Sequence, residues 1–350
     1  FGKAGVTLVT DTNVTPNFAF VNTLQGGTPM KITPSTTLQT LAEQYGAEYL
    51  LPGGQHFSAE NRTMTLQQLH EKNPTWATND MIFGLERLLK SEFQVFPLYK
   101  NESEKRNVKL TYLPAQKRTE DYCIILLAGG AYGAVCTMVE SLPVAAKFNE
   151  LGIDCFCLNY ETATPDSFEK GLLPAPLDDL AKSCKLIFET DKFDYKTYCV
   201  CGFSAGGHIA SLWGTNIIGA KKYNLPLPKA LLLVYPLITM ENVKDGPIKR
   251  YMCAGMFGKD CDLEKIRSYD TSRLACGTYP PTYIVRAEND STVSVKDGND
   301  LKSALDACHV KCVIEQAKTG EHGFGLGSET PLYGWTDRAV EFIKSTEVKI

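Results

Sequence analysis

The sequence predicts an α/β fold, in which a mostly parallel sheet carries helices on both faces. From about residue 106 onward, short apolar runs alternate with longer stretches whose apolar residues recur at helical spacing. Several runs are apolar throughout, which is typical of strands buried on both faces of a parallel sheet. One run, Tyr198–Cys201, leads through a tight turn directly into a helix-compatible segment. Such a turn is expected at the carboxyl edge of the sheet, where ligands bind.

The chain has 350 residues, more than the roughly 100–200 residues of an ordinary domain, but α/β domains often reach about 250 residues. Hydrophobic residues make up 43% and charged residues 22% of the chain, as in ordinary globular proteins. We therefore expect an α/β domain over residues 106–350. Residues 1–105 are expected to form an amino-terminal extension, a lid or arm beside the mouth of a ligand site.

The expected extension differs in composition from the rest of the chain. Thr and Asn are frequent through Thr7 to Thr40, which we interpret as loops. In residues 63–70 a hydroxyl residue precedes apolar positions three apart, which predicts a capped helix. Residues 81–90 place their apolar side chains on one helical face and predict a second helix.

In the α/β domain, each apolar run predicts a strand and each amphipathic stretch a helix. The expected strands are residues 108–113, 122–127, 154–160, 198–201, 230–235, 282–286 and 312–316. The expected helices are residues 142–151, 177–189, 205–214, 295–307 and 336–345. The longest connection, residues 237–279, contains a short helical candidate at 263–268. A connection of this length in an α/β domain is often functional, so we expect it to cover a pocket.

Composition also excludes several classes of function. A net charge of −4 and the lack of a Lys/Arg run give no footprint for nucleic acid. No apolar run approaches the roughly 20 residues of a membrane span. The segment Phe1–Val6 has no signal-peptide pattern, which favours a cytoplasmic location. Secretion remains the alternative, because the chain does not begin with Met and carries sequons such as Asn289-Asp290-Ser291.

Twelve cysteines are present. Five of them lie in expected core strands, where cysteine usually serves as a small apolar residue, so we favour reduced thiols over disulfides. These five are Cys123, Cys155, Cys157, Cys199 and Cys201. Cys308 and Cys312 are four residues apart, but no second ligand pair follows. No metal site is therefore expected.

Ser204 stands in the segment Gly202-Phe203-Ser204-Ala205-Gly206 between an expected strand and an expected helix. A serine hydroxyl becomes a useful nucleophile only when it is exposed at a tight turn near a general base and backbone N–H donors. At so tight a turn, a Cβ at Gly202 or Gly206 would collide with a neighbouring strand or helix. Ser204 is therefore our candidate nucleophile, although a plain strand-to-helix turn would show the same glycines.

The strand at 122–127 is followed by the glycine-rich turn Ala128–Gly133. Acyl transfer places negative charge on the carbonyl oxygen of the substrate, and backbone N–H groups can stabilise that charge. We expect Gly130 or Ala131 to supply one donor of an oxyanion hole and Ala205 to supply the other. A phosphate-binding loop is the weaker interpretation, because the turn lacks both the Gly-Lys-Ser/Thr ending and the Gly-x-Gly-x-x-Gly spacing.

His322 is the candidate base, because it follows the last expected strand in the glycine-rich loop Thr319–Gly325. His208 lies four residues beyond Ser204 and should point into the fold. His309 is expected to be structural. His56 and His70, in the extension, lack a partner at useful spacing and are expected to be surface or capping residues.

The base needs an acid that orients its ring. Asp290 follows the expected strand at 282–286 and is the preferred candidate. Glu288 is a rival nearer the strand, and Asp297 is a further rival that begins to enter the next expected helix. The order Ser204, Asp290, His322 along the chain is that of α/β-hydrolases.

With these residues the region 106–350 resembles the α/β-hydrolase superfamily, and within it the bacterial esterase/lipase group. That group includes hormone-sensitive-lipase-like, acetylxylan-esterase-like and feruloyl-esterase-like enzymes. The likeness rests on four stretches, which are Ala128–Tyr132, Gly202–His208, the Asp290 loop and His322–Gly327. It implies an α/β-hydrolase fold with Ser204 as nucleophile, His322 as base and Asp290 as the orienting acid.

The chain also departs from that group. Hormone-sensitive-lipase-like members usually carry His-Gly-Gly-Gly at the oxyanion turn, whereas this chain has Leu127-Ala128-Gly129-Gly130. The departure bears on the subgroup and hence on the substrate. Residues 65–105 look similar to an amino-terminal extension of uncharacterised bacterial members, for which no role is known.

The expected function is therefore serine carboxylic-ester hydrolysis through an acyl-enzyme, without a cofactor. The expected substrate is a small-molecule ester with a short acyl group, with acetylated and feruloylated carbohydrates as candidate classes. One alternative is a serine peptidase of the prolyl-oligopeptidase type, although no blade-like repeat appears in the sequence. The other alternative is a catalytically dead binding protein on a hydrolase fold.

Overall fold

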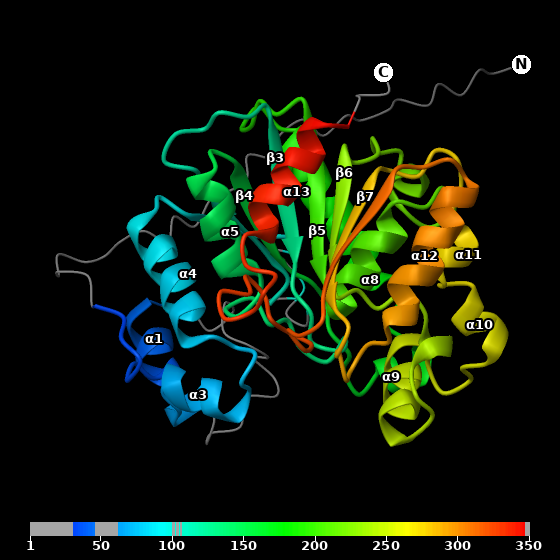
Figure 1. Cartoon of the computed structure of the whole chain (residues 1–350), viewed down its shortest axis with the longest axis horizontal. Helices are drawn as coiled ribbons and strands as arrows, with labels where there is room; N and C mark the ends of the chain where they lie inside the picture. The colour runs from blue at the N-terminus through cyan, green and yellow to red at the C-terminus, as the bar shows by residue number, and fades with distance from the viewer. Residues whose placement is uncertain (1–30, 46–61, 100–101, 103–104, 106, 347–350) are drawn as a thin grey trace, which may run out of the picture.

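A computed structural model of the chain describes residues 31–45, 62–99, 102, 105 and 107–346. An eight-stranded sheet with strand order β1-β2-β4-β3-β5-β6-β7-β8 runs through the centre of this part. Helices cover both faces of the sheet (Figure 1). The predicted α/β architecture is confirmed.

The strands pair in parallel except at one edge. They are β1 Gln94–Pro97, β2 Lys109–Leu113, β3 Tyr122–Leu127, β4 Asp154–Asn159, β5 Thr197–Phe203, β6 Ala230–Val234, β7 Thr282–Ala287 and β8 Cys312–Ala317. Pairing is antiparallel between β1 and β2 and between β2 and β4, and parallel across the remainder of the sheet. All strands expected from the apolar runs are present, with ends shifted by at most two residues.

The helices expected in the α/β domain are also present, with ends shifted by at most two residues. The helices of the described residues are α1 Leu38–Tyr45, α3 Leu66–Lys72, α4 Thr78–Lys90, α5 Ser141–Glu150, α6 Ser167–Lys170, α7 Ala175–Phe188, α8 Ser204–Trp213, α9 Pro247–Phe257, α10 Leu263–Arg267, α11 Thr271–Leu274, α12 Val295–Ala307 and α13 Trp335–Lys344. Two short 3₁₀ helices, η3 Ala220–Tyr223 and η4 Met240–Asn242, are also present.

Side chains of the central strands alternate between two hydrophobic cores. Tyr122, Ile124 and Leu126 of β3 join the core that includes residues of α4, α5 and α13. The intervening residues of β3 join the core that includes residues of α7, α8 and α12. Every residue of β3 is buried. A strand covered on both faces has no polar side to present to water, which is why these runs lack alternation.

The extension packs through α4 onto α5 of the α/β domain (Figure 1). The two helices approach closely, because a Cβ on Gly84 would lie 2.7 Å from the backbone nitrogen of Pro143. The helix expected at 63–70 is α3, and the hydroxyl residue that caps it is Thr65. Thr65 and Gln68 form a reciprocal capping box, with hydrogen bonds of 2.9 and 3.1 Å.

The sheet begins earlier in the chain than expected. The sequence places residues 94–97 in the extension, but they form β1, which pairs with β2 from Gln94 opposite Tyr112 to Pro97 opposite Lys109. The sheet therefore starts before the expected boundary at residues 105 and 106. Of the loops expected over Thr7–Thr40, residues 7–30 lie outside the described residues, as does His56.

The connection over residues 237–279 joins β6 to β7 and contains η4, α9, α10 and α11. The helical candidate at 263–268 corresponds to α10. Helix α9 packs beside α6, with the rings of Phe168 and Tyr251 4.9 Å apart. Because α6 follows β4 and α9 follows β6, both lie beyond the carboxyl ends of parallel strands, at the edge where β5 delivers Ser204.

All twelve cysteines are free thiols. The five cysteines expected in strands lie there and are buried. Among the described residues, no group of three or more His, Cys, Asp or Glu side chains could hold a metal ion. The same part of the chain contains no helix with the length and apolar character needed to cross a membrane.

Candidate active site

Ser204 stands at the sharp turn where β5 ends and α8 begins. Its φ of +50° is unusual for a residue with a side chain. The turn has no room for side chains on its glycines. A Cβ on Gly206 would lie 2.1 Å from the carbonyl oxygen of Leu127, and one on Gly202 would lie 2.3 Å from that of Gly206. These distances support the steric reason inferred from the sequence.

His322 joins Ser204 and Asp290 in one line of hydrogen bonds. Nδ1 of His322 lies 2.8 Å from Oδ2 of Asp290, and Nε2 lies 2.9 Å from Oγ of Ser204. An ionised carboxylate only accepts, so Nδ1 carries the proton and Nε2 of the neutral ring is left to accept from the serine hydroxyl. The three residues come from the loops after β7 and β8 and from the turn after β5. They lie together although 118 residues separate Ser204 from His322.

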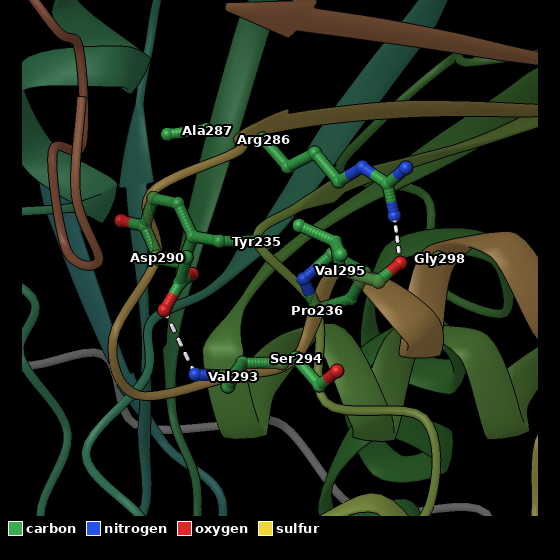
Figure 2. Close-up of a pocket in the computed structure, with 9 residues that line it drawn as sticks. All are labelled: Tyr235, Pro236, Arg286, Ala287, Asp290, Val293, Ser294, Val295 and Gly298. Atoms are coloured by element: carbon green, nitrogen blue, oxygen red, sulfur yellow. Dashed lines mark hydrogen bonds between the residues drawn. The ribbon is translucent and has the colours of Figure 1, made fainter. Parts of the chain in front are cut away.

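Asp290 is fixed by its own loop. Its Oδ1 accepts hydrogen bonds from the backbone N–H groups of Thr292 and Val293, at 2.9 and 2.8 Å. Figure 2 shows the carboxylate turned toward the Val293 amide, beside a small pocket. Because Oδ1 is held by these two donors, Oδ2 is left to face His322. The Asp290 side chain is only 3% exposed.

The loop that carries Asp290 is tied to its surroundings at both ends. On one side, the guanidinium of Arg286 donates to Val295 O and, at 2.7 Å, to Oδ1 of Asn299. On the other, the Asn289 side chain donates to Oε1 of Glu321 at 2.9 Å and accepts from the Glu321 N–H at 3.1 Å. The second pair joins the acid loop to the residue directly before His322.

The two rival acids lie elsewhere. Glu288 is exposed and accepts a 2.8 Å hydrogen bond from the Gln316 side chain. Asp297 is buried and accepts from the backbone N–H groups of Ile238 and Thr239, at 2.7 and 3.0 Å. Asp297 therefore holds the start of the 237–279 connection rather than the histidine.

His208 points into the fold, as expected. Its Nε2 lies 2.8 Å from the carbonyl oxygen of Tyr269 and its Nδ1 lies 2.7 Å from Oη of Tyr132. Burial lowers the pKa of His208 to about 4, so the ring is neutral near pH 7. His208 therefore supports Tyr132, the residue directly after Ala131. In the extension, Nδ1 of His70 lies 3.2 Å from the carbonyl oxygen of Trp76.

The glycine-rich turn after β3 lies against Ser204. A Cβ on Gly129 would lie 2.8 Å from Cβ of Ser204. Ala131 and the following Tyr132 both adopt positive φ, at +50° and +61°, a costly backbone conformation for residues with side chains. Ala205 lies in the first turn of α8, where a backbone N–H has no acceptor within its own helix. The candidate donors Gly130, Ala131 and Ala205 are thus brought to the same turn region as Ser204.

Residues 144–326 match a family of proteins with the alpha/beta hydrolase fold. The matched segment spans just over half of the chain and includes all three residues of the hydrogen-bonded line. The chain belongs to the α/β hydrolase family.

One curated relative of this α/β hydrolase is the acetylxylan esterase of Xylanibacter ruminicola, 26% identical over 212 residues. The match covers 59% of this chain and 41% of the relative, so the chain spans less than half of that protein's length.

Solved structures also resemble this hydrolase. The acetyl ester-xyloside bifunctional hydrolase of Caldicellulosiruptor lactoaceticus is 26% identical, with a TM-score of 0.59, over 72% of this chain and 95% of that one. A carbohydrate esterase from gut microbiota has the same TM-score of 0.59 at 17% identity, over 71% of this chain and 95% of that one. The second likeness, at such low identity, concerns the fold alone.

Two further residues of this hydrolase, Glu140 and Tyr235, were not singled out by sequence. The Glu140 carboxylate accepts hydrogen bonds from the Gly129 N–H and from the Tyr235 hydroxyl, the latter at 2.9 Å. The ring of Tyr235 lies against that of His322, with 4.8 Å between centroids. No local signal marks Glu140, because its partners lie 11 and 95 residues away in the chain.

The extension reaches the loop of His322. A Cβ on Gly323 would lie 3.4 Å from Oγ1 of Thr75 and 3.6 Å from Nε1 of Trp76. Further along the same loop, the Ser328 N–H donates a 3.3 Å hydrogen bond to Asp80 of α4. Thr75 and Trp76 are therefore neighbours of the residue directly after His322.

Proposed function

We propose that the chain is a serine carboxylic-ester hydrolase in which Ser204, His322 and Asp290 form a catalytic triad. The observation that carries the proposal is the unbroken line from Oγ of Ser204 through His322 to Asp290, with distances of 2.9 and 2.8 Å. Ser204 lies at a strained strand-to-helix turn, and a turn of this kind exposes the serine oxygen.

In the first half of the reaction, Oγ of Ser204 attacks the acyl carbon while Nε2 of His322 takes the hydroxyl proton. The charge that develops on the carbonyl oxygen is stabilised by the N–H of Gly130 or Ala131 and that of Ala205. His322 then passes the proton to the leaving alcohol, and the acyl group stays on Ser204.

In the second half, water enters in place of the alcohol. His322 removes a proton from this water, whose oxygen attacks the acyl carbon, and the proton is returned to Oγ of Ser204 as the carboxylic acid leaves. Asp290 holds the ring in the required tautomer throughout and stabilises its charged form. These steps require no cofactor.

The proposed substrate is a carbohydrate that carries short acyl esters, acetyl before feruloyl. The support comes from relatives, since the similar proteins at 26% identity are named an acetylxylan esterase and an acetyl ester-xyloside hydrolase. We further propose that the extension and the 237–279 connection form walls of the substrate site. Thr75 and Trp76 support this for the extension, because they lie beside Gly323.

Replacement of Ser204 by Ala tests the function. Wild-type protein should hydrolyse p-nitrophenyl acetate and release acetate from acetylated xylo-oligosaccharides, and the variant should lose nearly all turnover of both. Peptide p-nitroanilides serve as the comparison, because a peptidase would cleave them faster than the esters. Wild-type turnover in the Ser204→Ala variant, or failure of a fluorophosphonate to label Ser204 in the folded protein, would contradict the proposal.

A further inference from the structure

We propose that Glu140 is a positioning residue that couples the oxyanion turn to the loop of His322. The inference rests on the function proposed above, because it assigns Glu140 a part in arranging that site. Glu140 acts through Gly129 on one side and through Tyr235 on the other, without touching the substrate.

The contacts of Glu140 run toward both loops. Oε2 accepts from the N–H of Gly129, the residue before the proposed donors Gly130 and Ala131. Oε1 accepts from the Tyr235 hydroxyl at 2.9 Å. Oη of Tyr235 in turn accepts from the Gly325 N–H at 3.1 Å. Gly129, Glu140, Tyr235 and Gly325 thus form a continuous chain of hydrogen bonds.

Packing reinforces the same connection. The ring of Tyr235 lies 4.8 Å from that of His322 and 4.7 Å from that of Phe324, centroid to centroid. A Cβ on Gly325 would lie 2.4 Å from the carbonyl oxygen of Val139, so the histidine loop rests directly on the backbone before Glu140. A shift of this backbone would therefore move both loops.

Glu140 is not a helix cap. It occupies the N-cap position of α5, but its side chain makes no capping hydrogen bond. Both carboxylate oxygens are used at the site instead. Because the Tyr235 oxygen accepts from Gly325, its single proton is free to be donated to Glu140.

The surroundings also bear on the charge of Glu140, which is only 4% exposed. Burial raises the pKa of the Glu140 carboxyl group above its ordinary value, and the hydrogen bonds from Gly129 and Tyr235 offset only part of this rise. A buried carboxyl group is costly unless its hydrogen bonds are made. Glu140 therefore holds its two donors in place, and loss of either contact leaves polar groups unpaired inside the protein.

Asp154 offers a matched control. It is also a buried carboxylate, 3% exposed, and it also accepts from tyrosine hydroxyls and from one backbone N–H. These donors are Tyr112 at 3.0 Å, Tyr195 at 2.5 Å and the Ala115 N–H at 2.7 Å. Asp154 begins β4, so it lies at the amino edge of the sheet, away from Ser204. Asp154→Asn repeats the chemical change of Glu140→Gln outside the site.

The first measurement is hydrogen–deuterium exchange in peptides that cover residues 129–136 and 320–327. Glu140→Gln can keep one of its two acceptor contacts at most, so exchange should accelerate about tenfold or more in both peptides. Tyr235→Phe, which removes one link and retains the ring, should accelerate both as well. Asp154→Asn should accelerate neither.

The second measurement is steady-state hydrolysis of p-nitrophenyl acetate. Loss of one oxyanion donor costs about 10²–10³-fold in kcat, and a displaced donor should cost less. Glu140→Gln should therefore lower kcat about 10–100-fold with little change in KM, because the donors act on the transition state. Asp154→Asn should keep kcat and KM even where thermal stability falls.

The outcomes separate this inference from the proposed function. If wild-type protein hydrolyses no ester, the function fails, and the exchange experiment alone still decides whether Glu140 couples the loops. If Glu140→Gln does not fold, both measurements are made on Tyr235→Phe instead. Exchange that changes in one peptide only, or a kcat no lower than that of Asp154→Asn, would overturn the positioning role.

Discussion

The carbonyl oxygen of Leu127 lies 2.1 Å from where a Cβ on Gly206 would stand. This oxygen belongs to the end of β3, and backbone at the centre of a sheet cannot move aside cheaply. Gly206→Ala should therefore lower the free energy of unfolding by about 3 kcal/mol. Chemical denaturation monitored by circular dichroism measures the change.

Gly255 of α9 is the control for this substitution. A Cβ there would meet its nearest neighbour, Cβ of Ala163, at 3.5 Å, which is ordinary contact. Gly255→Ala should be neutral or stabilising by up to about 1 kcal/mol, because alanine favours the helix. Equal destabilisation by the two substitutions would show that the turn at Ser204 is less crowded than the structure indicates.

Asp290→Asn should reduce kcat on p-nitrophenyl acetate by about 10⁴-fold, the loss known from the corresponding change in serine proteases. The amide can hydrogen-bond His322 only in a way that favours the wrong tautomer for accepting the serine proton. Glu288→Gln is the matched control and should retain activity, since Glu288 is exposed and contacts Gln316. Comparable losses in both variants would argue against Asp290 as the orienting acid.

Trp76→Ala should alter the selectivity between substrates more than the rate of acyl transfer. Nε1 of Trp76 lies near Gly323, beside His322, so we expect the indole to contact the alcohol part of a large substrate. KM for an acetylated xylo-oligosaccharide should rise several-fold, while kcat/KM for p-nitrophenyl acetate should stay within about twofold. An equal effect on both substrates would indicate that Trp76 merely supports the histidine loop.

The free energy of unfolding should depend on pH because of Asp179. It is 0% exposed and accepts from the Tyr99 hydroxyl and the Glu161 N–H, at 2.6 and 2.7 Å. Burial raises its pKa from 3.8 to about 7, against these hydrogen bonds, which lower it. The folded protein therefore binds this proton more tightly than the unfolded chain. Between about pH 4 and 7, Asp179 should make the folded state less stable as pH rises.

Asp179→Asn removes the titrating group and should remove this slope. The free energy of unfolding is measured for both proteins from pH 4 to 8, and the difference, wild type minus variant, should fall between about pH 4 and 7 and level off above pH 7. Subtraction cancels the other ionisable groups, which the two proteins share. A difference that rises with pH would mean that the hydrogen bonds from Tyr99 and Glu161 outweigh burial.

The sequence predicts much of the α/β domain because buried parallel strands are apolar throughout. Residues 122–127 form β3 with the predicted ends. The edge strand β1 was missed, because four residues that end in proline and are only partly buried carry little pattern. Helix α9 was missed as well, since its turn-forming start, Gly246-Pro247, resembles a loop and two of its apolar residues, Ile248 and Tyr251, are exposed.

The candidate site, like the fold, is predicted by the sequence only in part. Ser204, Asp290 and His322 each stand at a recognisable position after a strand, so the sequence suggests them, and the structure brings them within hydrogen-bonding distance. Glu140 precedes a helix and resembles many surface glutamates. Its role depends on where β3 and β6 bring Gly129 and Tyr235, and no local pattern contains that information.

The outermost strand, β1, has a practical consequence for partial digestion of this protein. It pairs with one edge of β2, and its Pro97 lacks an N–H group that could pair with a strand of another molecule. Cleavage on the amino-terminal side of Gln94 would separate α1, α3 and α4 from the sheet, but β1 would still cover the edge of β2. Cleavage beyond Pro97 would bare the hydrogen-bonding groups of β2, and fragments cut there should stick to one another and precipitate.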